Sequence, residues 1–138
     1  CRDLLLFGTY EHQMDEKKRI RIPAKLKDAL GTTPIIMKGN GPYLVIYSQE
    51  RASEVIRNRF ASLIDEGGDE DNPDMDKLRD ITSNAQNAEE DKQGRVKLDG
   101  TLVSYAGLKK NVVTIGMVDR AEIWSAEAWE SRKKNKKA

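Results

Sequence analysis

Short runs of alternating apolar and polar residues open this chain, and clusters of turn-forming residues separate them. Residues 6–14 alternate weakly and predict a strand. After the turn "EKK", the run "RIRI" at 19–22 alternates with a period of two and predicts a second strand. Pro23 fits the first turn of a helix over 23–30, which Gly31 can cap. The pattern therefore begins with a hairpin and a short helix.

A second pair of strands and a longer helix are predicted next. "PIIMK" at 34–38 and "YLVIY" at 43–47 are apolar runs on either side of the turn "GNGP". Ser48 is a suitable N-cap for a helix to about Ile64. Apolar residues recur on one stripe of this helix, which supports the prediction. Residues 65–76 contain seven acids and no base, which predicts a solvated linker. A short helix over about 75–82 should follow it.

The opening pattern occurs twice in the chain. "DEKKRIRIP" at 15–23 is answered by "DKQGRVKLD" at 91–99, which lies 76 residues downstream. Leu26 and Gly31 recur as Leu102 and Gly107 at the same spacing. A repeat of this length indicates duplication of one supersecondary unit.

The later parts of the two halves match after a slip of one residue. "PIIMKG" is answered by "NVVTIG" at 111–116, and "LVIYSQE" is answered by "AEIWSAE" at 121–127. The second half therefore repeats strand, turn, strand, short helix and two strands, and it ends in a helix from Ser125 that carries Trp129. The fold class expected is mainly β with short helices, α+β.

Composition bounds the class of protein without naming a partner. The chain has 138 residues, enough for one domain or two small intertwined ones, and its net charge is +1. Charged residues make up 34% and the mean hydropathy is −0.71, so the surface is highly charged. No apolar run approaches the roughly 18 residues that span a bilayer. The single cysteine excludes an internal disulfide, and the basic end 132–138 is expected to be disordered.

The repeated Asp-x-x-x-Arg is the candidate site. Its carboxylate can accept turn N–H groups or pair with the arginine across the loop. A single such pair is an ordinary surface ion pair worth about 0–1 kcal/mol. Two copies at matching points of a repeat, each within a basic cluster, favour a function. Arginine forks suit phosphate and the guanine edge, and a hairpin can enter a major groove. The clustered cations beside Arg19 are Lys17, Lys18, Arg21 and Lys25, and those beside Arg95 are Lys92 and Lys97.

Other candidates are weaker. His12 has no Cys or second His to share a metal, and a strand histidine beside the hairpin is the favoured interpretation. Trp124 and Trp129 are interpreted as core or subunit packing rather than a base-stacking platform. An EF-hand loop starting at Asp69 would need glycine where Asp74 stands, so calcium is not predicted. No acid, base and nucleophile set can be assembled.

These motifs resemble the MraZ family, whose members carry two SpoVT-AbrB domains in one chain. The resemblance covers about 7–130 and rests on "FGTYEHQMDEKKRIRIPAKLKDAL", "DKQGRV", "YAGLKKNVVTIG" and "DRAEIW…AWE". It implies a pseudo-twofold β-barrel, subunits assembled into rings, and sequence-specific DNA binding in the nucleoid, on the operon for cell division and cell-wall synthesis. The implied divisions are 7–51 and 85–128 for the two domains, 52–84 for a helix, the acidic linker and a short helix, and 129–138 for the helix end and basic tail.

The chain departs from the family pattern at two points. Lys18 stands where the second half has Gly94, so the first hairpin tip is expected to differ in shape. Asp99-Gly100 replaces the Pro23-Ala24 of the first half, and Asp99 is expected to cap the following helix.

The sequence thus predicts a cytoplasmic, non-catalytic transcriptional regulator without cofactor, metal, membrane or small-molecule substrate. Its partners are double-stranded DNA with short repeated sites and further copies of itself. An antitoxin-like DNA-binding protein of the same fold and a ring-forming scaffold that binds no nucleic acid remain alternatives. Asp15 and Asp91 are expected to brace the turns. The residues expected to contact DNA are Lys17, Lys18, Arg19, Arg21, Lys92, Arg95 and Lys97.

Overall fold

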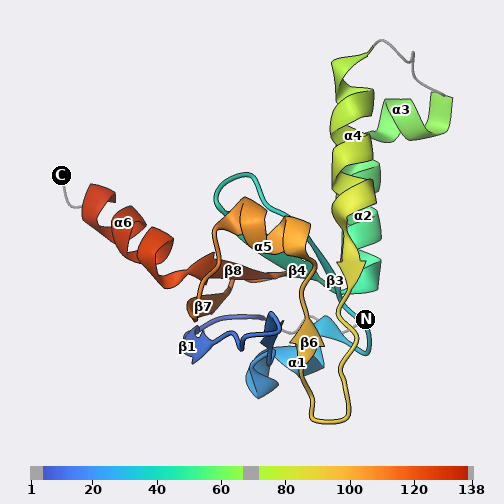
Figure 1. The fold of residues 1–138 in the computed structure, drawn as a ribbon. Helices are drawn as coiled ribbons and strands as arrows, with labels where there is room; N and C mark the ends of the chain where they lie inside the picture. Colours follow the sequence, from blue (N-terminus) through green and yellow to red (C-terminus); the bar gives the residue numbers. More distant parts are fainter. Residues whose placement is uncertain (1–4, 67–71, 137–138) are drawn as a thin grey trace.

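A computed structural model describes residues 5–66 and 72–136 of the chain. Within these ranges the protein is α+β, with a six-stranded antiparallel sheet, a separate two-stranded ladder and six helices (Figure 1). The first half holds β1 (Thr9–Gln13), β2 (Arg19–Ile20), α1 (Ala24–Leu30), β3 (Ile35–Lys38), β4 (Tyr43–Tyr47), α2 (Gln49–Arg59) and α3 (Ala61–Glu66). The second half holds α4 (Pro73–Asn84), β5 (Gln86–Asn87), β6 (Val96–Lys97), α5 (Gly100–Ala106), β7 (Asn111–Gly116), β8 (Ala121–Ser125) and α6 (Ala126–Lys136).

The two repeats exchange strands instead of forming separate sheets. The strand order is β1-β7-β8-β4-β3-β5, so the first strand of each half pairs with the third strand of the other. The centre of the sheet is the β4–β8 pair, and the second strands of the two halves pair as β2–β6. This pattern is unchanged when the halves are exchanged. The sheet is open, with β1 and β5 at its edges, so the expected closed barrel is not confirmed.

Matched apolar positions of the two halves meet in one core. Ile20 lies opposite Val96 in the β2–β6 ladder, and their side chains are 2% and 0% exposed. Leu26 of α1 and its counterpart Leu102 of α5 are likewise buried. The period-two alternation noted in the sequence therefore places one face of each short strand in the shared core.

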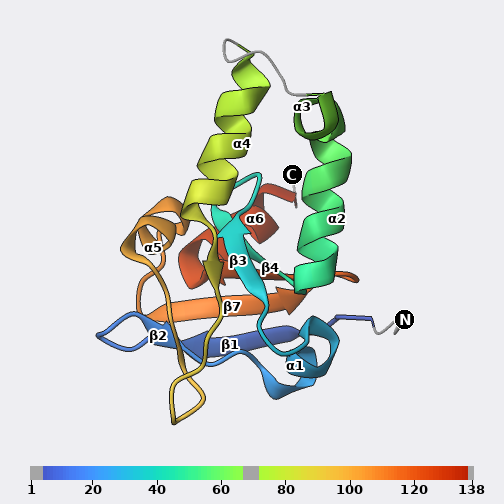
Figure 2. The same ribbon diagram turned by 90° about the vertical axis from the view of Figure 1, so that its right-hand side faces the viewer.

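A helical arm stands on the β3–β4 side of the sheet. Helices α2 and α4 rise together from it, with α3 at their far end (Figures 1 and 2). The Ser48 hydroxyl accepts a hydrogen bond from the N–H of Arg51 at 3.1 Å, which confirms the predicted N-cap. The expectation of one continuous helix to Ile64 is wrong. Phe60 leaves helical geometry, with φ −120° and ψ 30°, and its side chain is buried.

Both ends of the acidic segment 65–76 are helical, where the sequence predicted a solvated linker. Helix α4 begins at Pro73, and the side chain of Asn72 accepts a hydrogen bond from the N–H of Asp74 at 2.9 Å. Acids in a first helical turn interact favourably with the helix dipole, so Asp74 and Asp76 support the start of this helix. Asp65 belongs to α3 at the other end of the segment. Residues 67–71 lie outside the described ranges.

The basic end of the chain is also more regular than expected. The hydroxyl of Ser125 accepts a hydrogen bond from the N–H of Ala128 at 3.0 Å, and α6 continues to Lys136. The ring of Trp129 lies edge-on against that of Trp124, with centroids 5.5 Å apart. Trp124 is 8% exposed, which confirms its place in the core. The predicted disorder is wrong up to Lys136, because capping and this aromatic contact stabilise the helix.

Candidate functional site

The first Asp-x-x-x-Arg forms a closed hairpin tip. One oxygen of Asp15, Oδ1, accepts hydrogen bonds from the N–H groups of Lys17 and Arg19, each at 2.9 Å. The other, Oδ2, accepts from the Nε of Arg19 at 2.7 Å. The main-chain N–H of Asp15 donates to the carbonyl of Arg19, and that of Lys18 donates to the carbonyl of Asp15, each at 3.0 Å. The carboxylate therefore accepts hydrogen bonds from the main-chain N–H groups of the turn and holds the Arg19 guanidinium through its Nε.

The second hairpin repeats this geometry bond for bond. Asp91 accepts from the N–H groups of Gln93 and Arg95 at 2.9 Å and from the Nε of Arg95 at 3.2 Å. Its own N–H donates to the carbonyl of Arg95, and the N–H of Gly94 donates to the carbonyl of Asp91. The sequence left two contacts open for the carboxylate, the turn N–H groups and the arginine, and both occur in each hairpin.

The predicted difference in shape between the two tips is wrong. Lys18 has φ 63°, and Gly94 has φ 76°, so both occupy the left-handed region. A lysine there costs about 1–2 kcal/mol relative to ordinary backbone conformations, whereas a glycine adopts it readily. The hydrogen bonds to Asp15 hold the lysine in a conformation that its side chain disfavours.

The fold brings the two motifs into one site. Pairing of β2 with β6 places Arg19 directly opposite Lys97. Each arginine then approaches the aspartate of the other hairpin. Nη1 of Arg19 lies 3.9 Å from Oδ2 of Asp91, and Nη1 of Arg95 lies 3.6 Å from Oδ2 of Asp15. The result is a cluster of two cations and two anions that we call the arginine cluster, made of Arg19, Arg95, Asp15 and Asp91.

Both aspartates of the arginine cluster stay ionised at neutral pH. Desolvation raises the pKa of Asp15, but the N–H groups of Arg19 and Lys17 and the Arg19 guanidinium outweigh it and lower the pKa below its ordinary value. The N–H of Arg95, which outweighs desolvation, likewise lowers the pKa of Asp91. The arginine side chains are 25% and 24% exposed, so their outer edges still face solvent.

The remaining predicted cations surround the arginine cluster. Lys17, Lys18, Lys92 and Lys97 are exposed and have no ion-pair partner within the described ranges. Arg21 differs, because its Nη1 donates to the carbonyl of Gln93 in the other hairpin. This bond ties the two hairpins together.

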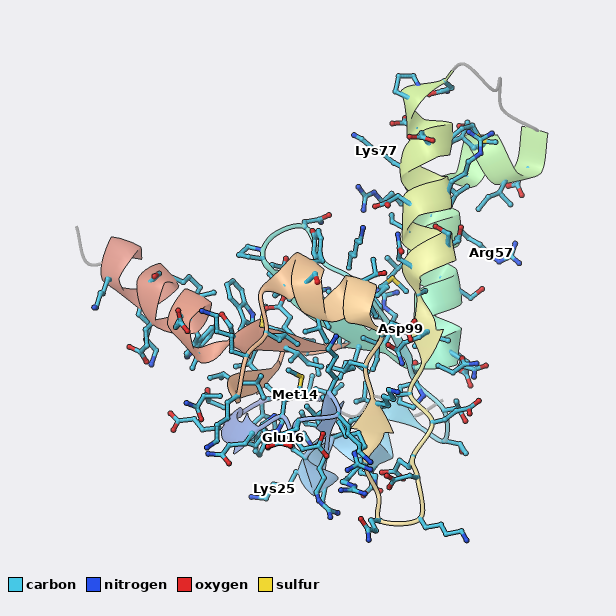
Figure 3. All side chains as sticks on the ribbon, in the orientation of Figure 1. Met14, Glu16, Lys25, Arg57, Lys77 and Asp99 are labelled. Carbon is cyan, nitrogen blue, oxygen red and sulfur yellow. The ribbon has the colours of Figure 1, made fainter. Side chains whose placement is uncertain are left out.

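The hairpins and the helical arm lie at different ends of the molecule. Figure 3 shows Glu16 and Lys25 at the lower end, where the β5–β6 loop also lies, and Arg57 and Lys77 on α2 and α4 of the arm. The acids that begin α4 therefore lie away from the hairpin tips. A chain of nearly neutral charge can present cations on one end in this way.

Weaker candidates have structural explanations. Nε2 of His12 lies 2.6 Å from Oγ1 of Thr114 on the neighbouring strand β7, and burial lowers the pKa of this histidine. This confirms a strand histidine beside the hairpin. The described residues contain no group of three His, Cys, Asp or Glu side chains arranged to hold a metal ion. None of the described helices is both long and apolar enough to cross a membrane.

A hollow beside the first hairpin contains residues that the motif did not indicate. Its volume is about 830 Å³, and Lys109 and Lys110 line it together with Arg19. These lysines follow α5 and lie about 90 residues after the first motif in sequence, so no local pattern linked them to it. The pairing of β1 with β7 creates the proximity, since it places Gln13 opposite Asn111.

The fold and the site together define a class of protein: two interlocked α+β repeats whose arginine-bearing hairpins meet in a single cluster. A family model described as "MraZ protein, putative antitoxin-like" matches residues 5–65 and 81–138. The chain is 35% identical over 127 residues to the "Transcriptional regulator MraZ" of Corynebacterium urealyticum, covering 91% of this chain and 85% of that protein. Proteins with the same name from Clostridium beijerinckii and Acetivibrio thermocellus are each 36% identical, over 91% and 92% of this chain and 84% and 85% of theirs. The chain belongs to the MraZ family.

Proposed function

We propose that this chain is a sequence-specific DNA-binding regulator of transcription and that it has no catalytic activity. The arginine cluster is the observation that carries the proposal. In each hairpin the aspartate holds the arginine through Nε. Within the described ranges, Nη2 of Arg19 and Nη2 of Arg95 have no hydrogen-bond partner. Two restrained guanidinium groups with outer donors to spare suit the guanine edge, which accepts two hydrogen bonds in the major groove.

The roles of the other residues follow from their positions. The exposed lysines around the arginine cluster would neutralise phosphates and set the register of the protein on the duplex. Asp15 and Asp91 would act as braces that orient the arginines and would not themselves bind DNA. The residues assigned to DNA contact are therefore Lys17, Lys18, Arg19, Arg21, Lys92, Arg95 and Lys97.

The names of the relatives support a target in gene regulation. We infer that the chain acts on DNA upstream of its own gene, within a cluster of division and cell-wall genes, and that it associates with the nucleoid. We also infer that residues 7–51 and 85–128 are its two SpoVT-AbrB units. The exchange of strands between the halves supports this division, because every ladder of one unit has a counterpart in the other.

Assembly should supply much of the affinity. One chain offers a single arginine cluster, and two such clusters in one particle would bind neighbouring sites with a high effective concentration. We propose a homo-oligomeric ring on a series of short sites. Affinity should therefore rise steeply as a second and third copy of the site are added to the DNA.

The test measures binding to duplex DNA from upstream of the gene, with one or several copies of the protected sequence, at matched salt. The variant Arg19→Ala/Arg95→Ala removes both guanidinium groups, and we expect it to lose specific binding while it still folds. Arg57→Ala is the matched control, because Arg57 lies on the arm and its Nε donates to Ser53 of the same helix. Parent-like binding by the double variant, or no preference of the parent for upstream DNA over shuffled DNA, would contradict the proposal.

A further inference from the structure

The hollow beside the first hairpin is strongly cationic at its rim. Six cations line it, against the two acids Asp15 and Glu16. Its neutral wall includes Met14, Val103 and Leu108. His12 also faces it and adds no charge near neutral pH, because burial lowers its pKa from an ordinary value near 6.5. The cations are Lys18, Arg19, Arg21, Arg95, Lys109 and Lys110.

The two lysines after α5 are held in place relative to the arginine cluster. The carbonyl of Lys110 accepts a hydrogen bond from the N–H of Met14 at 2.8 Å, and Met14 directly precedes Asp15. Lys110 has no ion-pair partner in the part of the chain that the structure describes. Lys109 lies 3.6 Å from Glu127, but both side chains are more than 70% exposed, so solvent and salt weaken this pair. Both lysines are therefore available to an anion.

The matching flank of the second hairpin is different. The matching segment of the first half, between α1 and β3, is Gly31-Thr32-Thr33, which carries no charge. The positions of Met14 and Val103 in the neutral wall correspond to Glu90 and Lys27. Those two side chains form an ion pair with each other. The hollow beside the first hairpin thus presents spare cations, whereas the matching positions of the other half carry hydroxyls and a neutralised pair.

We propose that Lys109 and Lys110 bind backbone phosphates of DNA beside the first hairpin, so that each chain takes a single orientation on its site. This inference rests on the proposed function. The arginine cluster is nearly symmetric and by itself would fit a site in either direction. A pair of lysines on one flank adds phosphate contacts on that side only, and such contacts set register and orientation. A phosphate strand carries closely spaced charges and can therefore contact several of these cations at once.

The main experiment compares the salt dependence of binding by the parent and by Lys109→Gln/Lys110→Gln. Each phosphate neutralised contributes about 0.9 to the slope of log affinity against log salt. We expect the double variant to lower the slope by about two and to weaken binding to specific and shuffled DNA by the same factor. Thr32→Gln/Thr33→Gln is the matched control in the corresponding segment of the other half and should leave the slope unchanged. Thr32→Lys/Thr33→Lys should raise it.

Phosphate-ethylation interference on DNA with a single site shows whether the chain binds that site in one orientation. The parent should show interference extending further on one side of the protected bases, and the Lys109→Gln/Lys110→Gln variant should lose that extension. An unchanged slope together with a symmetric parent pattern would overturn the inference. If Arg19→Ala/Arg95→Ala still lost specific binding in that case, the proposed function would stand without it. Failure of the parent to bind the DNA at all would overturn both.

Discussion

The two hairpins share one geometry but differ in sequence at the tip. In both, an aspartate accepts the same pair of main-chain N–H groups and holds the arginine four residues later through Nε. The left-handed residue is Lys18 in one hairpin and Gly94 in the other. The shape of the tip is therefore set by the aspartate and the ladder between β2 and β6, and glycine only makes that shape easier to adopt.

The surroundings of the hairpins differ more than the hairpins themselves. The first has Lys17 and Lys18 at its tip, where the second has Gln93 and Gly94. The first also faces the cationic hollow, whereas the flank of the second carries the Lys27–Glu90 pair. The chain thus holds two copies of one arginine-holding device, and the cationic hollow beside the first copy makes its surroundings the more positive.

The largest effect should appear when the arginines of the two copies are removed singly. Arg19→Ala should weaken specific DNA binding by about 1–3 kcal/mol, since a good bidentate base contact is worth that much. Arg95→Ala should be similar or milder, because fewer cations flank Arg95. Equilibrium binding at fixed salt measures both, with Arg57→Ala as control.

The two losses should also be coupled. Each arginine approaches the aspartate of the other hairpin, so removal of one changes the environment of its partner. A double-mutant cycle should give a non-zero interaction term, as residues within one network generally do. Parent-like affinity of Arg19→Ala would eliminate the first hairpin as a DNA reader. Strict additivity would separate the hairpins into two independent sites.

Much of the fold was readable because the repeat is local and periodic. The strand and helix order follows from alternation at 19–22, from the caps at Ser48 and Ser125, and from the recurrence of Leu26 as Leu102. The pairing of β1 and β5 with strands of the other half could not be predicted, since no local sequence signal indicates which distant strand pairs at each edge of the sheet. Helix α4 starts with an N-cap at Asn72 and a proline in its first turn, Pro73. Both signals are present in the sequence, but the surrounding acids favoured the prediction of a linker there.

The site was predictable in its members and not in its arrangement. Asp15, Arg19 and their copies were identified because the same Asp-x-x-x-Arg spacing occurs at matching points of the repeat, each time within a basic cluster. The approach of Arg19 to Asp91 spans 72 residues and depends on the β2–β6 ladder. Asp99 shows a similar limit: it occupies the N-cap position of α5, but its side chain makes no capping hydrogen bond. The residue predicted at the N-cap position is therefore correct, but the side-chain hydrogen bond expected from it does not form.

A smaller effect should follow from neutralising the aspartates. Asp15→Asn keeps an oxygen for the turn N–H groups but loses the charge that holds Nε of Arg19, so this side chain should become mobile and specific binding should fall. Asp91→Asn should do less, because its contact with Arg95 is longer, 3.2 Å against 2.7 Å. Exchange broadening of the arginine Nε–H resonances by NMR measures mobility, alongside DNA affinity.

The rival explanation is that Asp15 acts only by repelling DNA. Glu16→Gln separates the two ideas, because Glu16 is an exposed carboxylate on the same tip with no ion-pair partner among the described residues. Removing its charge should tighten binding slightly, by reduced repulsion alone. If Asp15→Asn tightens binding to the same degree as Glu16→Gln, the aspartate is not a brace.

The smallest expected effect concerns the left-handed residue of each tip, which is Lys18 in one hairpin and Gly94 in the other. Lys18→Gly should stabilise the fold by up to about 1.5 kcal/mol, because relief of the left-handed strain of about 1–2 kcal/mol outweighs the added freedom of glycine in the unfolded chain, about 0.5–1 kcal/mol. Gly94→Lys should destabilise it by a similar amount. A side chain at Gly94 meets no close contact, since a Cβ there would lie 3.5 Å from its nearest neighbour, Nη1 of Arg21. Denaturant unfolding of the two variants and of the double exchange measures the effect, and the double exchange should return close to the parent. If Lys18→Gly is destabilising, the lysine contributes a contact at the tip that outweighs its strain, and the two tips are not interchangeable.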